Sequence, residues 1–295
     1  MNSLVEDIKK FFKAADALNR LIIVNLSVFF VLKICLVFFA LFKLPTDLYQ
    51  LILNQIMLPS NIGKLVLQPW SLFTYMFVHE DLMHILSNLL WLYIFGKIFI
   101  YYKGGRTLTT VYVLGGLSGG MLYVLAFNIF PLFAESVHFS YALGASAGIL
   151  AIVIATATYV PDYSIRLIFL GAVPLKYIAI FSVMSDAISI TSANAGGHIA
   201  HLGGAVFGYI YIKQMQQGKN MGKWFENLLE SLKKAFKPQP KMRVEHRRPM
   251  TDEQYNDQRK ARQDEIDRIL DKIAKSGYDS LSKHEKDTLF KASNK

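Results

Sequence analysis

The stretch FTYMFVHEDLMHILSNLLWLYIFG, residues 73–96, decides the fold. Its apolar second half is the start of an apolar stretch that is long enough, as a helix, to span a membrane. Its first half contains HEDLMH (79–84), which has one residue more than the zinc-protease motif H-E-x-x-H. On one continuous helix His79 and His84 would point about 140° apart, which argues against a zinc site. His84 and Asn88 are four residues apart, so they share a face and can both donate hydrogen bonds.

The composition is that of a membrane protein. The chain has 295 residues, of which 53% are hydrophobic, and its mean hydropathy is +0.29. This is too apolar for an ordinary soluble domain and long enough for several spans. Six apolar stretches predict six spans, at residues 21–42, 83–102, 107–130, 141–160, 164–188 and 196–214.

The distribution of Lys and Arg predicts the orientation of these spans. Twenty of the 32 Lys and Arg residues lie at Lys213 or beyond, whereas the loops 131–140 and 189–195 contain none. Cytoplasmic loops carry the excess of basic residues, so we expect both termini to be cytoplasmic in a bacterial inner (plasma) membrane. Most of the formal net charge of +10 comes from the tail. It predicts contact with the anionic lipid surface and no nucleic-acid partner.

Four segments are expected along the chain. Residues 1–20 form an N-terminal cytoplasmic amphipathic segment, and residues 21–214 form the six-span core. Residues 215–250 form an interfacial helix (221–236) and a basic linker, and residues 251–295 form a small helical pair. In this pair Gly277 ends the first helix, and Ser282 with Glu285 caps the second.

Polar residues at membrane depth are costly, so their positions point to function. Five of them lie toward the outer ends of spans two, four and six: His84, Asn88, Ser146, His198 and His201. A serine, a histidine and side-chain donors at one depth are the components of nucleophilic acyl transfer. Lys33, near the middle of span one, has no role that the sequence explains.

Small residues indicate that spans four and six lie in close contact. Gly144 and Gly148 flank Ser146 in GASAG, and a stripe of small residues runs through span six beside His201. The stripe consists of Gly197, Ala200, Gly204 and Gly208. Such residues let two helices approach closely, which a short serine side chain needs in order to reach a histidine on another helix.

These motifs together resemble the rhomboid intramembrane serine proteases. The matching parts are residues 73–96 with their H-x4-H-x3-N pattern, GASAG (144–148) and AHLGGAVFG (200–208). They occur in the family's order, and the resemblance covers about residues 20–214. It implies an all-α, rhomboid-like six-transmembrane-helix bundle with a small helical cytoplasmic tail.

The resemblance also implies roles for individual residues. Ser146 would be the nucleophile and His201 its general base, in a catalytic dyad. The side chains of His84 and Asn88 would form the oxyanion hole with the Ser146 N–H. Around them, His79 is expected to brace the loop before span two, and Gly144 and Gly204 to support close packing.

Two further polar residues are interpreted as structural. Asp186 could complete a Ser-His-Asp triad, but the resemblance implies a dyad, so we interpret Asp186 as a structural or water-facing group. We also interpret His198 as structural. The sequence departs from the pattern common in the family at Ala147, Leu150 and Ile100, which concerns loop anchoring and packing around the histidine.

The function expected from the resemblance is intramembrane proteolysis without a metal or cofactor. The substrates would be single-pass membrane proteins, cut near the outer face beside a small residue. The alternative is a non-catalytic rhomboid-like scaffold that binds transmembrane helices, although such proteins generally lack the Ser or the His. A transporter is disfavoured because the inner halves of spans two, four and six are nearly all apolar. The C-terminal tail could bind a cytoplasmic partner.

Overall fold

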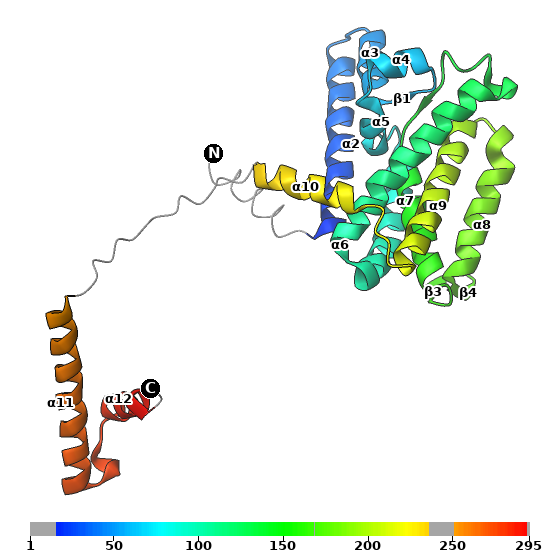
Figure 1. Ribbon diagram of the computed structural model, residues 1–295. Helices are drawn as coiled ribbons and strands as arrows, with labels where there is room; N and C mark the ends of the chain where they lie inside the picture. Colours follow the sequence, from blue (N-terminus) through cyan, green and yellow to red (C-terminus); the bar gives the residue numbers. More distant parts are fainter. Residues whose placement is uncertain (1–15, 168, 236–250, 294–295) are drawn as a thin grey trace. The chain divides into compact units, whose positions relative to one another are not determined.

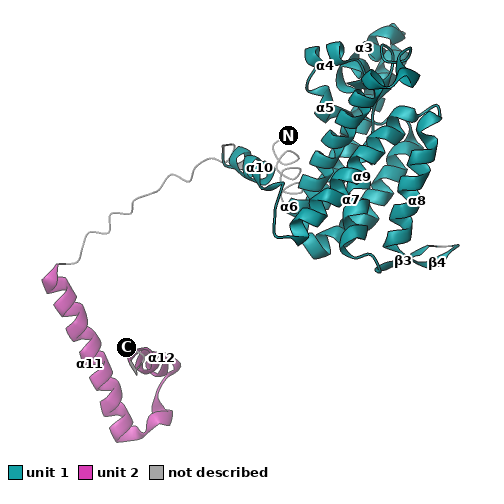
Figure 2. Ribbon diagram, turned by 45° about the vertical axis from the view of Figure 1, so that its right-hand side comes forward, with its two compact units in different colours: residues 1–237 teal, residues 238–295 magenta. Residues whose placement is uncertain are grey.

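The computed structural model describes residues 16–167, 169–235 and 251–293. The chain forms two compact units, residues 1–237 and 238–295 (Figure 2). The predicted N-terminal amphipathic segment, apart from its last residues, and the basic linker at 237–249 lie outside the described residues.

The first unit is built from helices (Figure 1). They are α2 (Ala17–Leu41), α3 (Thr46–Ile56), α4 (Ile62–Leu67), α5 (Ser71–Thr74), α6 (Leu82–Ile129), α7 (Ser146–Tyr159), α8 (Leu175–Ile188), α9 (Ala195–Gln216) and α10 (Lys223–Ala235). Short 3-10 turns occur at Tyr75–Phe77, Pro131–Phe133 and Ser189–Thr191. This architecture confirms the predicted all-α membrane bundle.

Two small antiparallel strand pairs accompany the helices. Strand β1 (Leu58–Pro59) pairs with β2 (Tyr141–Ala142), so that Leu58 lies opposite Ala142. Strand β3 (Ser164–Leu167) pairs with β4 (Gly171–Pro174), with Ser164 opposite Pro174. The two pairs lie toward opposite ends of the bundle in Figure 1.

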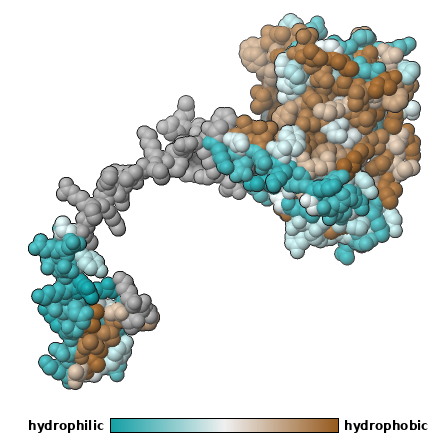
Figure 3. Space-filling view, viewed as in Figure 1, coloured by the Kyte–Doolittle hydropathy of each residue, from teal (hydrophilic) through white to brown (hydrophobic). Residues whose placement is uncertain are grey.

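The outer surface of the bundle is apolar, as expected for a protein in lipid. Among the described helices, α2 and α6 are long and apolar enough to cross a membrane. Large hydrophobic side chains are exposed along α2 and α8, including Val31, Ile34, Phe181 and Ile188. In Figure 3 hydrophobic residues cover the upper and middle part of this face, and hydrophilic residues gather at the lower end and along α10.

The predicted second and third spans are joined within α6. At Gly104 the backbone has φ 79° and ψ 162°, so the helix is interrupted there. A positive φ costs glycine little because it has no Cβ. The helical segment before Gly104 therefore corresponds to the predicted second span, and the segment after it corresponds to the predicted third span.

The predicted fourth and fifth spans are longer than the helices that form. Residues 141–145 are not part of α7, which begins at Ser146, and residues 164–174 form the β3–β4 hairpin ahead of α8. Gly171, with φ 73°, lies at the start of β4, and Pro174 precedes α8. Hydropathy cannot separate an apolar hairpin from a helix, which is why the prediction merged them.

Helices α6, α7 and α9 form the centre of the bundle and contact one another. Small residues make this possible. A Cβ added to Gly204 of α9 would overlap the backbone oxygen of Ala147 in α7, and one on Gly208 would overlap that of Ala151. On α7, a Cβ at Gly148 would lie 2.5 Å from the carbonyl oxygen of Tyr112 in α6.

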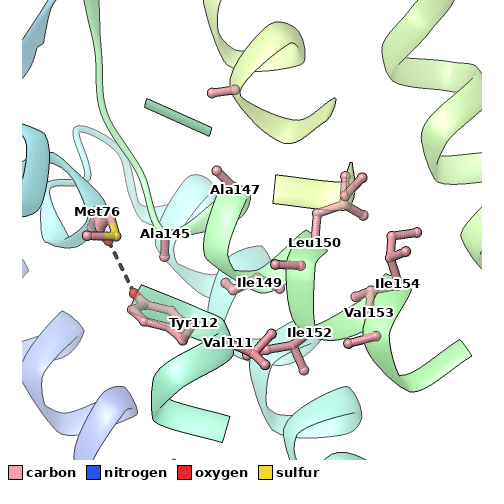
Figure 4. Packing of buried hydrophobic residues seen from close by; sticks show 14 of the residues in the cluster. Met76, Val111, Tyr112, Ala145, Ala147, Ile149, Leu150, Ile152, Val153 and Ile154 are labelled. Atoms are coloured by element: carbon pink, nitrogen blue, oxygen red, sulfur yellow. Dashed lines mark hydrogen bonds between the residues drawn. The ribbon is translucent and has the colours of Figure 1, made fainter. Parts of the chain in front are cut away.

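A buried chain of hydrogen bonds links α2 and α6 to the 3-10 turn at Tyr75–Phe77. The amide of Asn25 donates to the Tyr112 hydroxyl at 3.1 Å, and this hydroxyl donates to the Met76 carbonyl at 3.3 Å. Figure 4 shows the second bond, with the side chains of Ile149 and Ile152 from α7 close by. Asn25 and Tyr112 are both fully buried, so each needs such a partner.

Helix α10 lies within the predicted interfacial helix and leaves an apolar face exposed. Trp224 is 61% exposed, and Leu228 and Leu232 are each 47% exposed. Arg106, near the middle of α6, lies 3.7 Å from Glu230 of α10. The helix is thus tied to the bundle while its apolar side chains remain available to the lipid surface.

The second unit contains α11 (Asp252–Ser276), a 3-10 turn (Tyr278–Ser280) and α12 (Lys283–Ser293). Gly277 ends α11 with φ 78°. Ser282 and Glu285 form the predicted capping box, in which the Ser282 N–H donates to Glu285 at 2.7 Å and the Glu285 N–H donates to Ser282 at 3.3 Å. Glu285 also accepts from Lys272 of α11 at 2.9 Å, which joins the two helices.

We predict that Gly204→Val weakens the fold of the first unit. The new Cβ would overlap the Ala147 backbone, and overpacking of this kind typically costs about 1–3 kcal/mol or more. Thermal unfolding in detergent should show a lower midpoint for this variant. Tyr209→Phe is the matched control, because Tyr209 is 50% exposed on the same helix. An unchanged midpoint in Gly204→Val would contradict the packing described here.

Candidate active site

Ser146 is the first residue of α7, at a point where the backbone changes from irregular to helical. The segment before it is fixed by Gly144, whose N–H donates to the Tyr75 carbonyl at 2.9 Å. Gly144 has φ 115°, and a Cβ there would lie only 2.9 Å from Nε2 of His84. Position 144 therefore requires glycine for both conformation and space.

Ser146 and His201 lie in hydrogen-bond contact. The Oγ atom of Ser146 is 2.6 Å from Nε2 of His201, which belongs to α9. This is the distance expected between a nucleophile and its base. The sequence placed these two residues on different spans, and the close α7–α9 packing brings them together.

The other nitrogen of His201 contacts an acidic side chain. Asp186, near the end of α8, has its Oδ1 atom 2.9 Å from Nδ1 of His201 and 2.8 Å from Nδ1 of His198. Its side chain is largely buried. Asp186 and His198 are predicted from the sequence to be structural, and the contact of Asp186 with His201 is not predicted. The signal that could have found it is that antiparallel spans five and six place Asp186 at the same end as His201.

His79 braces the loop before α6 through three hydrogen bonds. Its Nδ1 donates to the Phe77 carbonyl at 3.3 Å. Its Nε2 accepts from the Asn88 amide at 3.0 Å and from the Ala145 N–H at 3.4 Å. His79 thus connects this loop to α6 and to the residue before Ser146.

His84 and Asn88 lie on the same side of α6 but differ in what they contact. The His84 imidazole lies against Gly144, and the same added Cβ at Gly144 would be 3.7 Å from Ser146 Oγ. Asn88 is buried, borders the same cavity as Ser146, and gives one amide hydrogen to His79. A primary amide has two hydrogens, so one remains for another acceptor.

Lys33 takes part in the same region. Its ammonium donates to the Glu80 carbonyl in the loop before α6 and lies 5.5 Å from the centre of the Phe29 ring. A lysine near the middle of α2 therefore has a polar partner. This explains a residue for which the sequence gives no role.

A cavity of about 750 Å³ opens beside Ser146. Its walls come from the first half of α6, from α7 and α8, and from the β3–β4 hairpin. Apolar side chains predominate, including Trp91, Phe95, Ile149, Val153, Ile178 and Phe181. The polar residues Ser146, Asn88, Asp186 and His201 also line it, so one mostly apolar cavity borders the polar group.

Asp186, His198 and His201 also form a group that could hold a metal ion. One nitrogen or oxygen atom from each lies within 4.8 Å of the others. His79 and His84 of HEDLMH are not part of this group. His79 and His84 instead place their rings edge to face at 5.0 Å.

The model of the Rhomboid domain family matches residues 66–217, which include the whole group of polar side chains around Ser146 from His79 to His201. The chain belongs to the rhomboid family. A second model, described as a family of unknown function (DUF6576), matches residues 250–295. The rhomboid match ends just after α9, so α11 and α12 fall under this separate family.

Two curated relatives are rhomboid-like proteins. "RHOMBOID-like protein 12, mitochondrial" of Arabidopsis thaliana is 29% identical over 158 residues, which are 50% of this chain and 47% of the relative. "Presenilin-associated rhomboid-like protein, mitochondrial" of Mus musculus is 26% identical over 178 residues, which are 59% of this chain and 44% of the relative. The rhomboid chain thus matches about half the length of these relatives.

These relatives contradict the predicted location. Both are named as mitochondrial proteins, from a plant and a mouse, so the prediction of a bacterial inner membrane with cytoplasmic termini is wrong. The physical reason is that Lys and Arg bias distinguishes two sides of a membrane. It does not say which membrane is crossed, because apolar spans of similar length serve in all of them.

We predict that His79→Phe lowers the stability of the rhomboid unit. The ring fits a similar space but leaves the Ala145 N–H and one Asn88 hydrogen without an acceptor, which typically costs about 1–3 kcal/mol for each buried group. Thermal unfolding in detergent near neutral pH should detect the loss. An unchanged midpoint would show that the brace contributes nothing.

The same variant tests a pH dependence. Burial, and to a smaller extent the nearby His84 imidazole, lowers the pKa of His79 to about 4. An unfolded histidine takes up its proton near pH 6.5, so the fold loses stability as pH falls from about 6.5 to about 4. Between about pH 7.5 and about pH 5, the midpoint should fall further in the wild type than in His79→Phe. Equal losses would contradict a neutral, buried His79.

Proposed function

We propose that this rhomboid is an intramembrane serine endopeptidase that cleaves the transmembrane segments of single-pass membrane proteins. The observation that carries the proposal is the 2.6 Å contact between Ser146 Oγ and His201 Nε2 inside an apolar bundle. A serine with a histidine acceptor at this distance is an activated nucleophile. A serine used for helix packing alone would not need a base.

The reaction begins with attack of Ser146 Oγ on the carbonyl carbon of the scissile peptide. Nε2 of His201 takes the hydroxyl proton as the new C–O bond forms. The imidazolium then gives this proton to the leaving amine, the C–N bond breaks, and an acyl-enzyme remains. Water attacks the ester, His201 takes its proton, and the carboxylic product leaves as Ser146 regains its hydrogen.

The negative oxygen that forms in both steps needs hydrogen-bond donors. Ser146 opens α7, and the first N–H groups of a helix have no acceptor within that helix. The positive end of the helix dipole points to the same place. The His84 ring and the second Asn88 hydrogen supply two further donors beside Ser146.

The cavity supports a hydrophobic polypeptide as substrate. It borders Ser146 and is lined mainly by apolar side chains of α6, α7 and α8. A helix hides its peptide groups behind its own hydrogen bonds, so the substrate must unwind locally to present a carbonyl. Segments with weak helix formers such as glycine are therefore the preferred targets.

Covalent labelling tests the proposal. The purified protein in detergent should react with a fluorescent fluorophosphonate, and Ser146→Ala should lose both the label and the cleavage of a single-pass model substrate. The hydroxyl is the group that forms the covalent bond, and its loss removes no packing atom larger than oxygen. A folded wild type that binds a transmembrane helix but neither labels nor cleaves would favour the scaffold alternative.

The oxyanion donors provide a second prediction. His84→Ala and Asn88→Ala should each lower kcat about 10²–10³-fold, the usual cost of losing one such donor. Met83→Ala is the control on the same helix, because Met83 is 75% exposed. Unfolding midpoints separate lost catalysis from the lost His79–Asn88 bond. Full turnover in both variants would show that these side chains are not the donors.

A further inference from the structure

Asp186 is an acid in a region where acids are costly. Its side chain is largely buried on α8, and it borders the same cavity as Ser146. A carboxylate at membrane depth is disfavoured unless it is paired and hydrogen-bonded, and intramembrane acids are usually functional. If this position served only for packing, an uncharged side chain could fill it without the free-energy cost of burying a carboxylate.

One oxygen of Asp186 meets two imidazoles. Oδ1 lies 2.9 Å from Nδ1 of His201 and 2.8 Å from Nδ1 of His198. An ionised carboxylate can only accept hydrogen bonds, so both Nδ1 atoms carry the hydrogen. The hydrogen on Nδ1 leaves Nε2 of neutral His201 with a free lone pair, and that atom faces Ser146 Oγ at 2.6 Å.

We infer that Asp186 is a positioning residue for His201, and that His198 in turn holds Asp186. The inference rests on the proposed protease function and extends it from a Ser-His dyad to a Ser146–His201–Asp186 triad. Asp186 selects the tautomer that can accept the serine proton and fixes the plane of the ring. It also stabilises the imidazolium formed during attack, without itself taking the proton.

His198 completes this arrangement from the same helix as His201. The two rings lie edge to face with their centres 5.9 Å apart. By donating to the same oxygen, His198 keeps the carboxylate of α8 directed at α9. The residue is three positions before His201, so both imidazoles lie on one face of α9.

The distances favour hydrogen bonds over a zinc site formed by these three residues. In tetrahedral zinc coordination with bonds of about 2.0–2.1 Å, two ligand atoms lie about 3.3 Å apart. The observed separations of 2.8 and 2.9 Å are shorter and match charge-assisted hydrogen bonds. A test with a chelator decides between the two arrangements directly.

Asp186→Asn is the decisive variant. Asparagine has the same shape and can still donate to an imidazole, but an amide hydrogen directed at Nδ1 would favour the tautomer with its hydrogen on Nε2. We expect kcat on a model substrate to fall about 10²–10⁴-fold while KM and the unfolding midpoint stay near wild-type values. A merely structural role would instead lower the midpoint and leave kcat per folded molecule unchanged.

A matched pair at position 198 tests the second contact. His198→Asn places an amide donor close to where Nδ1 lies, whereas His198→Leu fills similar space without a donor. Loss of this one hydrogen bond should lower kcat about tenfold in His198→Leu. His198→Asn should retain more of the wild-type kcat than His198→Leu. Equal kcat values in the two variants would overturn the role given to His198.

The outcomes separate this inference from the function on which it rests. Wild-type protein that labels and cleaves, together with wild-type kcat in Asp186→Asn, would overturn the triad and leave the protease intact. Wild-type protein that is folded but neither labels nor cleaves would overturn both. Loss of cleavage after EDTA treatment, restored by Zn²⁺, would show that the three side chains hold a metal and would overturn the triad.

Discussion

The backbone contact between α7 and α9 is the constraint on which the rest of the first unit depends. Gly204 and Gly208 lie directly against the carbonyl oxygens of Ala147 and Ala151, with no room for a Cβ. Lipid provides no hydrophobic driving force between two helices, so close packing of small residues is what holds them together. The same contact sets the distance from Ser146 to His201. At the usual separation between two packed helices, the serine side chain would be too short to reach the imidazole.

The second constraint is irregular backbone inside the bundle. Helix α7 has 14 residues, about 21 Å at 1.5 Å per residue, so it is too short to cross the apolar layer alone. Its N-terminus is therefore buried within the bundle, preceded by β2 and Gly144. Non-helical backbone at such depth is tolerated where protein covers it or water reaches it. Here Ala142 and Ala145 are buried, and the cavity borders Ser146 on its open side.

The polar side chains around this point depend on one another. His79 accepts from Asn88 and from the Ala145 N–H, and Lys33 donates to the Glu80 carbonyl in the same loop. Asp186 and His198 surround the far side of His201. A bundle surrounded by lipid must satisfy these groups internally, and doing so fixes the orientation of the residues that face Ser146.

The sequence by itself determined the membrane class and the order of the apolar stretches, and its resemblance to the rhomboid family implied the pairing of Ser146 with His201. Hydropathy, small-residue spacing and the three motifs are local properties of the chain, so they can be read without coordinates. Only the tertiary structure decided that 164–174 form a hairpin, that α7 begins at Ser146, and that Asp186 contacts His201. An apolar run fits a strand as well as a helix, and residues 15 positions apart on separate helices meet only once the angle and register of those helices are set. The physical reason is that local pattern specifies which faces are apolar, whereas contacts between helices depend on how those faces pack together.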